Sequence, residues 1–146
     1  MPDQTPAEQL TAAAARVREF AAIATPGPWR PHDTHLGEYG HTATVLTDRE
    51  ELNATELVAW LPTMGHKPWN EDRNVWANSA WMALMHPAVG AALADWLDDE
   101  ARAHEAAEQA AANVFHDDPG NRAAWIAAQT NESALAVARQ LLGGAS

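Results

Sequence analysis

The sequence contains no cysteine and only one lysine, and its aromatic residues are seven tryptophans beside two phenylalanines and one tyrosine. The absence of cysteine excludes a disulfide scaffold and a thiolate nucleophile. No apolar run approaches the roughly 20 residues that a transmembrane helix requires. The polar, acidic start at Met1–Thr11 also lacks the basic and then apolar pattern of a secretory signal. We therefore expect a cytoplasmic protein with no membrane partner.

Catalytic signatures are also missing. None of Ser79, Ser133 and Ser146 lies in a G-x-S-x-G elbow, and the chain has neither a glycine-rich phosphate loop nor an H-E-x-x-H motif. Adjacent carboxylates such as Asp98 and Asp99 point apart on a helix, which disfavours a paired acid and base. The sequence therefore favours a binding protein over an enzyme, and it implies no cofactor.

The composition is typical of one globular domain spanning residues 1–146. The chain is 47% hydrophobic and 20% charged, which is enough apolar surface for a single core. Its formal net charge of −11 opposes direct binding to nucleic acid. A basic partner, or a ligand held in a local pocket, fits this charge better.

The hydropathy pattern predicts an α+β fold that is predominantly helical. Residues 1–24 form an N-terminal helix that begins after Thr5 and ends before the Thr25–Pro28 turn. Residues 25–62 contain β-prone runs separated by turn residues, which indicates a small antiparallel sheet of about three strands. These runs lie near 28–31, 42–46 and 57–61. Residues 63–73 form a loop and residues 74–146 the helical part.

The C-terminal helices are expected to include a long antiparallel hairpin. A first helix ends near His86, Pro87 opens a second that reaches about Val114, and one last helix follows a break at 116–121 and ends at Gly143 and Gly144. The stretch Ala101–Asn113 has no large apolar side chain, so its helix rests on alanine propensity or on a partner. It is either a solvent-projecting arm or an oligomer interface, and we expect a homo-oligomer through this hairpin.

Tryptophans and basic side chains gather in the stretch MGHKPWNEDRNVWANSAW. Indole rings stack on planar ligands, and nearby cationic groups bind phosphates. This combination predicts a pocket for a small nucleotide-like ligand. Trp76 and Trp81 lie five residues apart and point to different sides of one helix, so at least one of them suits a core or an interface instead. The candidate ligand-binding residues are His66, Lys67, Trp69, Arg73, Trp76 and Trp81.

A second cluster offers metal-binding chemistry. Imidazole and carboxylate are ligands of zinc and related metals, and a loop could bring such groups together. The alternative hypothesis is a small metal-dependent enzyme that uses His32, Asp33, His35 and His41. The spacing of these residues matches no known motif, and exposed loop histidines are the more common case.

The region from Asp95 to Asp118 carries eight carboxylates against Arg102 alone. A regular acidic helix can imitate a phosphate backbone, so an acidic DNA mimic is a further alternative. A purely structural oligomerisation module that joins alanine-rich helices is another. The ordinary explanation of the acidic region is a solvated helix surface.

Three phrases carry a family resemblance: ATPGPWR at Ala24–Arg30, HPAVGAALADWLDDEA at His86–Ala101, and ALAVARQLLG at Ala134–Gly143. They resemble small accessory proteins of actinobacteria and their phages. In such relatives the helical hairpin often carries cysteines, which are absent here. The resemblance implies a non-catalytic binding protein that blocks a host protein or sequesters a nucleotide-type defence signal.

Overall fold

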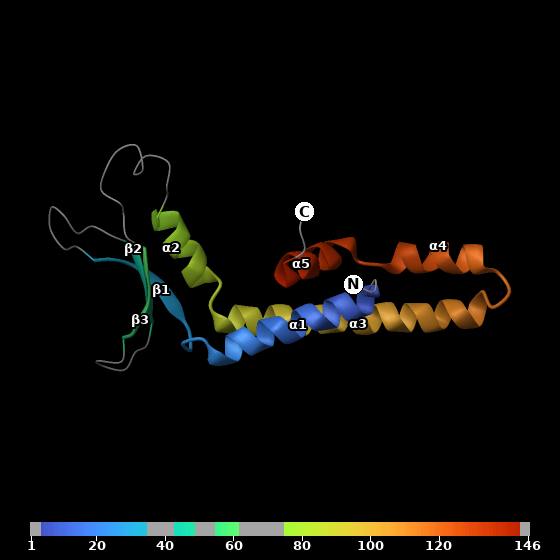
Figure 1. The fold of residues 1–146 in the computed structure, drawn as a ribbon, viewed down its shortest axis with the longest axis horizontal. Helices are drawn as coiled ribbons and strands as arrows, with labels where there is room; N and C mark the ends of the chain where they lie inside the picture. Colours follow the sequence, from blue (N-terminus) through green and yellow to red (C-terminus); the bar gives the residue numbers. More distant parts are fainter. Residues whose placement is uncertain (1–3, 35–42, 49–54, 62–74, 144–146) are drawn as a thin grey trace. The chain divides into compact units, whose positions relative to one another are not determined.

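The computed structural model describes residues 4–34, 43–48, 55–61 and 75–143. These residues confirm an α+β fold that is predominantly helical, with an N-terminal helix, a three-stranded antiparallel sheet and C-terminal helices (Figure 1). The predicted strands agree with the observed ones to within about two residues. In chain order the elements are α1 (Pro6–Ile23), β1 (Trp29–Asp33), β2 (Ala43–Thr47), β3 (Leu57–Leu61), α2 (Val75–Leu84), α3 (Pro87–Val114), α4 (Pro119–Gln129) and α5 (Glu132–Leu142).

Contacts between residues group the chain into two compact units. The helical unit comprises Met1–Phe20 and Ala91–Ser146, and the sheet unit comprises Ala21–Gly90. The single domain that the composition predicts would comprise both. Each unit buries side chains of its own, so each has a separate apolar core.

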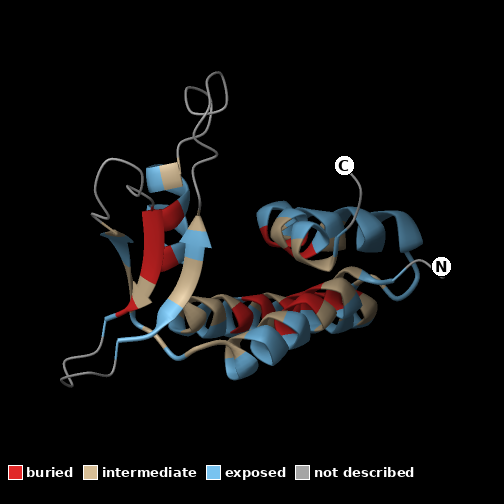
Figure 2. Cartoon of the chain, turned by 60° about the vertical axis from the view of Figure 1, so that its left-hand side comes forward, coloured by how far each residue is buried: buried red, intermediate tan, exposed pale blue. Residues whose placement is uncertain are grey.

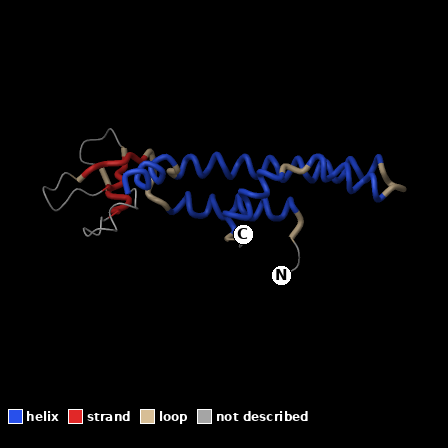
Figure 3. The backbone as a smooth tube through the Cα atoms, turned by 90° about the horizontal axis from the view of Figure 1, so that it is seen from above, coloured by secondary structure: helices blue, strands red, loops and turns tan. Residues whose placement is uncertain are grey.

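Three helices supply the core of the helical unit. In each of them the buried residues recur every three or four positions and therefore line one face. Most are alanines, which allow the helices to approach closely, and the leucines fill the space between them. Figure 3 shows α1 and the α4–α5 segment running along α3. The core consists of Leu10, Ala13 and Ala14 of α1, Ala94, Leu97 and Ala101 of α3, and Ala134, Leu135 and Ala138 of α5.

Polar contacts fix the two ends of α1. At its start the Thr5 hydroxyl accepts from the Glu8 amide at 3.2 Å, and the Glu8 carboxylate accepts from the Thr5 amide at 2.8 Å, which is a reciprocal capping box. Near its other end Arg18 donates to Asp95 at 2.6 Å and to Asp98 at 2.5 Å on α3. Both bonds raise the pKa of Arg18 above its ordinary value, and the bond to Asp95 is the larger cause. The guanidinium fork therefore links α1 to α3.

The alanine-rich stretch 101–113 does pack within the chain. Every third or fourth side chain along it is buried, which forms a narrow stripe on one side of α3. The hydropathy pattern does not predict this stripe, because it contains no large apolar side chain, whereas small side chains suffice where helices lie close. The stripe consists of Ala101, His104, Ala107 and Ala111.

The segment after α3 forms two helices, where the sequence analysis expected one. Thr130 leaves helical geometry with ψ of 127°, and its hydroxyl donates to the Ile126 carbonyl at 2.9 Å. Asn131 then caps α5, its side chain accepting from the Ala134 amide at 3.1 Å. The expectation of one helix was wrong because apolar spacing continues across a break that these two polar side chains create. The end at Gly143 is confirmed by its left-handed φ of 77°.

The sheet unit consists of a three-stranded sheet with α2 on one face. Strand order is β1-β2-β3, both pairs are antiparallel, and β2 lies at the centre. Helix α2 packs on β1 and β2, and the Ser79 hydroxyl donates to the Thr44 carbonyl at 2.6 Å. Ser79 and Ala83 are buried against the sheet, while the residues on the opposite side of α2 are exposed (Figure 2).

Candidate binding site between β1 and α2

An open cavity of about 370 Å³ lies between β1 and α2. It is lined by Pro31, His32, Asp33, Trp76 and Ala80. Side chains alternate across a strand, so Pro31 and Asp33 point toward α2 while His32 lies between them on the other face. On the helix, Trp76 and Ala80 are four residues apart and share one side. Local geometry therefore assembles the cavity from two elements distant in sequence.

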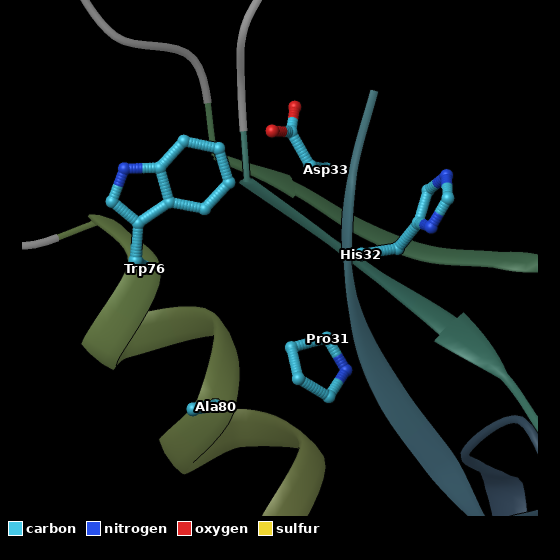
Figure 4. A pocket seen from close by; sticks show the side chains of 5 residues that line it. All are labelled: Pro31, His32, Asp33, Trp76 and Ala80. Atoms are coloured by element: carbon cyan, nitrogen blue, oxygen red, sulfur yellow. The ribbon is translucent and has the colours of Figure 1, made fainter. Parts of the chain in front are cut away.

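The cavity joins an aromatic wall to a carboxylate. The Trp76 side chain remains 45% exposed, and Figure 4 shows the Asp33 carboxylate on the same side of β1 as its indole. An indole face stacks on planar groups and attracts cations, and a carboxylate accepts hydrogen bonds from amino groups. This arrangement suits a planar ligand that carries exocyclic amino groups. Trp76 was predicted for this role from the sequence, whereas the position of Asp33 beside it was not.

Four of the predicted ligand-binding residues, His66, Lys67, Trp69 and Arg73, lie outside the described residues. The segment that contains them connects β3 to α2. The segment follows Leu61, the last residue of β3, and precedes Val75, the first residue of α2. Across the sheet, Leu61 pairs with Ala43 of β2, and Ala43 pairs with Asp33 of β1. Both attachment points therefore belong to the elements at the cavity end of the sheet unit.

Trp81 belongs to a different surface from Trp76, as the five-residue spacing predicts. It is 64% exposed and shares its side of the helix with Leu84, which is 62% exposed. No residue of α2 carries a charge. The outer face of α2 is our name for the exposed apolar residues at the end of this helix and the methionine that follows it, namely Trp81, Met82, Leu84 and Met85.

Sequence reasoning missed part of both surfaces. It did not distinguish the exposed Met82 from Ser79 and Ala83, which are buried against the sheet. It also missed Pro31 and Ala80 as cavity walls. Strand alternation places Pro31 on the same face of β1 as Asp33, and the four-residue spacing places Ala80 on the same side of α2 as Trp76. These patterns identify cavity walls only once it is known that α2 covers β1.

The structure separates the two described members of the metal cluster. Asp33 points toward Trp76, whereas His32 points away from the cavity (Figure 4). The His32 Nδ1 lies instead 3.5 Å from an Arg30 guanidinium nitrogen. Within the described residues no group of three histidine, aspartate or glutamate side chains is arranged to hold a metal ion. His35 and His41 lie outside the described residues.

Most carboxylates of the acidic region contact donors in the same chain. Arg18 binds Asp95 and Asp98, Arg102 binds Asp99, and the Trp96 indole N–H donates to Glu100 at 3.1 Å. Histidines contact two more, since His104 lies by Glu108 and His116 by Asp117. Asp118 caps α4. These partners disfavour a phosphate-mimicking stripe, which needs carboxylates free to meet another protein.

Among the described residues, no helix is both long and apolar enough to span a bilayer. Comparison with protein-family models, with curated proteins and with solved structures finds no match to this chain.

Proposed function

We propose that this chain is a non-catalytic binding protein whose cavity between β1 and α2 takes a small nucleotide-type ligand. The observation that carries the proposal is the pairing of the exposed Trp76 indole with the Asp33 carboxylate across a cavity of about 370 Å³. A cavity of this size falls within the range of small-molecule sites. Sequestration requires only binding, which agrees with a chain that carries no catalytic motif.

The recognition scheme follows from the chemistry of the walls. The base stacks on Trp76, and its amino groups donate to Asp33. A phosphate group then extends away from Asp33, because two negative charges repel each other. Lys67 and Arg73, which lie outside the described residues in the segment between β3 and α2, supply the cationic groups in our proposal. The resemblance to phage accessory proteins supports sequestration of a host signal as the biological purpose.

Calorimetric titration with adenosine, guanosine and their 5′-monophosphates tests this function. We expect Trp76→Ala to weaken binding by about 5- to 150-fold, because stacking contributes about 1–3 kcal/mol per base. Trp96→Ala is the matched control, since Trp96 is a partly exposed tryptophan of the helical unit. Native mass spectrometry of protein taken directly from cells reports any retained ligand. Absence of binding to the whole panel, or equal affinity in the two variants, contradicts the proposal.

The outer face of α2 supports a second candidate function, in which the chain blocks a host protein. Three large apolar side chains are exposed on a helix without charge and a fourth, Met85, directly follows it, and apolar patches of this kind are typical of protein interfaces. We expect Trp81→Ser with Leu84→Ser to abolish a stable complex with a purified partner while ligand binding stays unchanged. Val114→Ser, at an exposed apolar residue of α3, is the control. A complex that survives the double substitution removes this candidate.

A further inference from the structure

The side chains that line the cavity between β1 and α2 present a carboxylate as their polar group. Pro31 and Ala80 are apolar, and Pro31 also lacks a backbone N–H. His32 points away from the cavity, and the indole N–H of Trp76 is turned away from Asp33 (Figure 4). Among these five residues, Asp33 therefore supplies the side chain that meets the polar edge of a ligand stacked on Trp76.

Asp33 has the position and the chemistry to select one kind of edge. It is the last residue of β1 and is half-buried, whereas Pro31 and His32 before it are exposed. An ionised carboxylate only accepts hydrogen bonds, and it presents two oxygens side by side. These oxygens have about four lone-pair sites, so two ligand N–H groups leave capacity for the contacts that Asp33 makes within the chain. The ligand edge that fits this carboxylate carries two adjacent donors.

Among the common bases, guanine has such an edge. Its ring N1–H and its 2-amino group lie side by side, so each can donate to one carboxylate oxygen. Adenine and cytosine place a ring nitrogen lone pair beside their amino group, and uracil places a carbonyl on each side of its ring N–H. In each of these three bases an acceptor would face a carboxylate oxygen, and two acceptors repel each other.

We propose that the cavity selects guanine over the other bases through a paired hydrogen bond to Asp33. This inference rests on the proposed nucleotide-binding function and names the base for it. The guanine ring stacks on Trp76, and Pro31 and Ala80 form the apolar walls around it. Asp33 is half-buried, so a base that leaves one of its oxygens facing an acceptor loses more affinity than it would at an exposed carboxylate.

Calorimetric titration of the full chain with the 5′-monophosphates of guanosine, inosine and adenosine tests this selection. The three ligands share their ribose and phosphate, so differences in affinity report the base. The inosine base keeps N1–H but lacks the 2-amino group, and it therefore loses one hydrogen bond to a charged group. We expect it to bind about 10- to 150-fold more weakly than the guanosine nucleotide. The adenosine nucleotide, which turns a lone pair toward Asp33, should bind most weakly.

Asp33→Asn provides the test on the protein side. The substitution replaces one carboxylate oxygen with an amide N–H group, which complements the lone pair of adenine and opposes the 2-amino group of guanine. We expect this variant to lose the preference for guanosine over inosine and to favour adenosine over guanosine. Asp48→Asn is the matched control, because Asp48 is an exposed carboxylate of the sheet unit that contacts Arg30 at 3.6 Å. It should keep the wild-type order of affinities.

The outcomes separate guanine selection from the function on which it rests. Equal affinity of the wild-type chain for the three nucleotides, weakened alike by Trp76→Ala, retains nucleotide binding and overturns guanine selection. A guanosine preference that persists in Asp33→Asn, or that Asp48→Asn removes equally, overturns the role of Asp33. No binding of any of the three nucleotides overturns both proposals. The wild-type order of affinities decides the question even where a variant does not fold.

Discussion

At the scale of single residues, position around a helix or across a strand decides what a side chain can bind. Trp76 and Trp81 lie five residues apart, which turns their side chains by about 140° around α2. One therefore lines the cavity and the other lies on the outer face. Asp33 and His32 are separated in the same way by strand alternation. Only Asp33 joins the cavity chemistry, although the two residues are adjacent in the sequence.

Gly27 is a residue whose lack of a side chain is required by packing. A Cβ atom at this position would lie 2.8 Å from His86 Nδ1 and 3.3 Å from His86 Cβ, so the root of the histidine side chain blocks it. We expect Gly27→Ala to lower the free energy of unfolding by about 1–3 kcal/mol, as overpacking does. Urea denaturation measures this change.

Gly120→Ala is the control for Gly27→Ala, because the added Cβ atom has room at Gly120. Gly120 lies in α4, and the atom nearest to its added Cβ is 3.6 Å away, an ordinary contact. Alanine favours helix over glycine by up to about 1 kcal/mol, so this variant should be as stable as the wild type or more stable. If both substitutions shift stability alike, the contact between Gly27 and His86 is not the cause.

At the scale of elements, the ends of the C-terminal helices depend on a few polar side chains. Asp118 precedes Pro119 and caps α4, where its carboxylate accepts from the backbone and side-chain nitrogens of Asn121 at 3.0 and 2.6 Å. Both bonds hold the pKa of Asp118 below its ordinary value, and the bond from the Asn121 backbone amide is the larger cause. The cap therefore stabilises α4 more strongly while the carboxylate is ionised.

The pH dependence of this cap has a defined sign. The pKa of Asp118 is depressed in the folded chain, so its contribution is present above the ordinary aspartate value and is lost as pH falls through the lower, folded value. We expect Asp118→Ala to lower the unfolding midpoint at neutral pH and this deficit to become smaller in acid. Circular dichroism at a series of pH values measures it. Asp117→Ala, at the neighbouring carboxylate that contacts His116, should not show that pattern.

At the scale of the whole molecule, the two units bury separate cores. Leu97 belongs to the core of the helical unit and is fully buried, whereas Val45 is fully buried at the centre of the sheet unit. Substitutions at distant sites without shared partners usually have additive effects on the free energy of unfolding. The division predicts that damage to one core leaves the packing of the other intact.

A double-substitution cycle tests this independence. Leu97→Ala should cost about 2–5 kcal/mol of unfolding free energy. Its effect should add to that of Val45→Ala within about 0.5 kcal/mol. Leu97→Ala with Leu135→Ala is the control pair, because both leucines belong to one core and should couple. Chemical denaturation of the single and double variants measures both cycles, and strong coupling between Leu97 and Val45 contradicts two separate cores.

The sequence by itself determined the elements of this protein, and the tertiary structure decided which of their faces meet. Apolar spacing, Pro87 and Gly143 predicted helices and their ends, because these signals act within one or two turns of the chain. The break at Thr130 escaped that reasoning, since polar side chains end α4 where the apolar spacing does not. The pairing of Asp33 with Trp76 and the burial of His104 were also unpredictable. They depend on contacts between segments distant in sequence, which no local periodicity encodes.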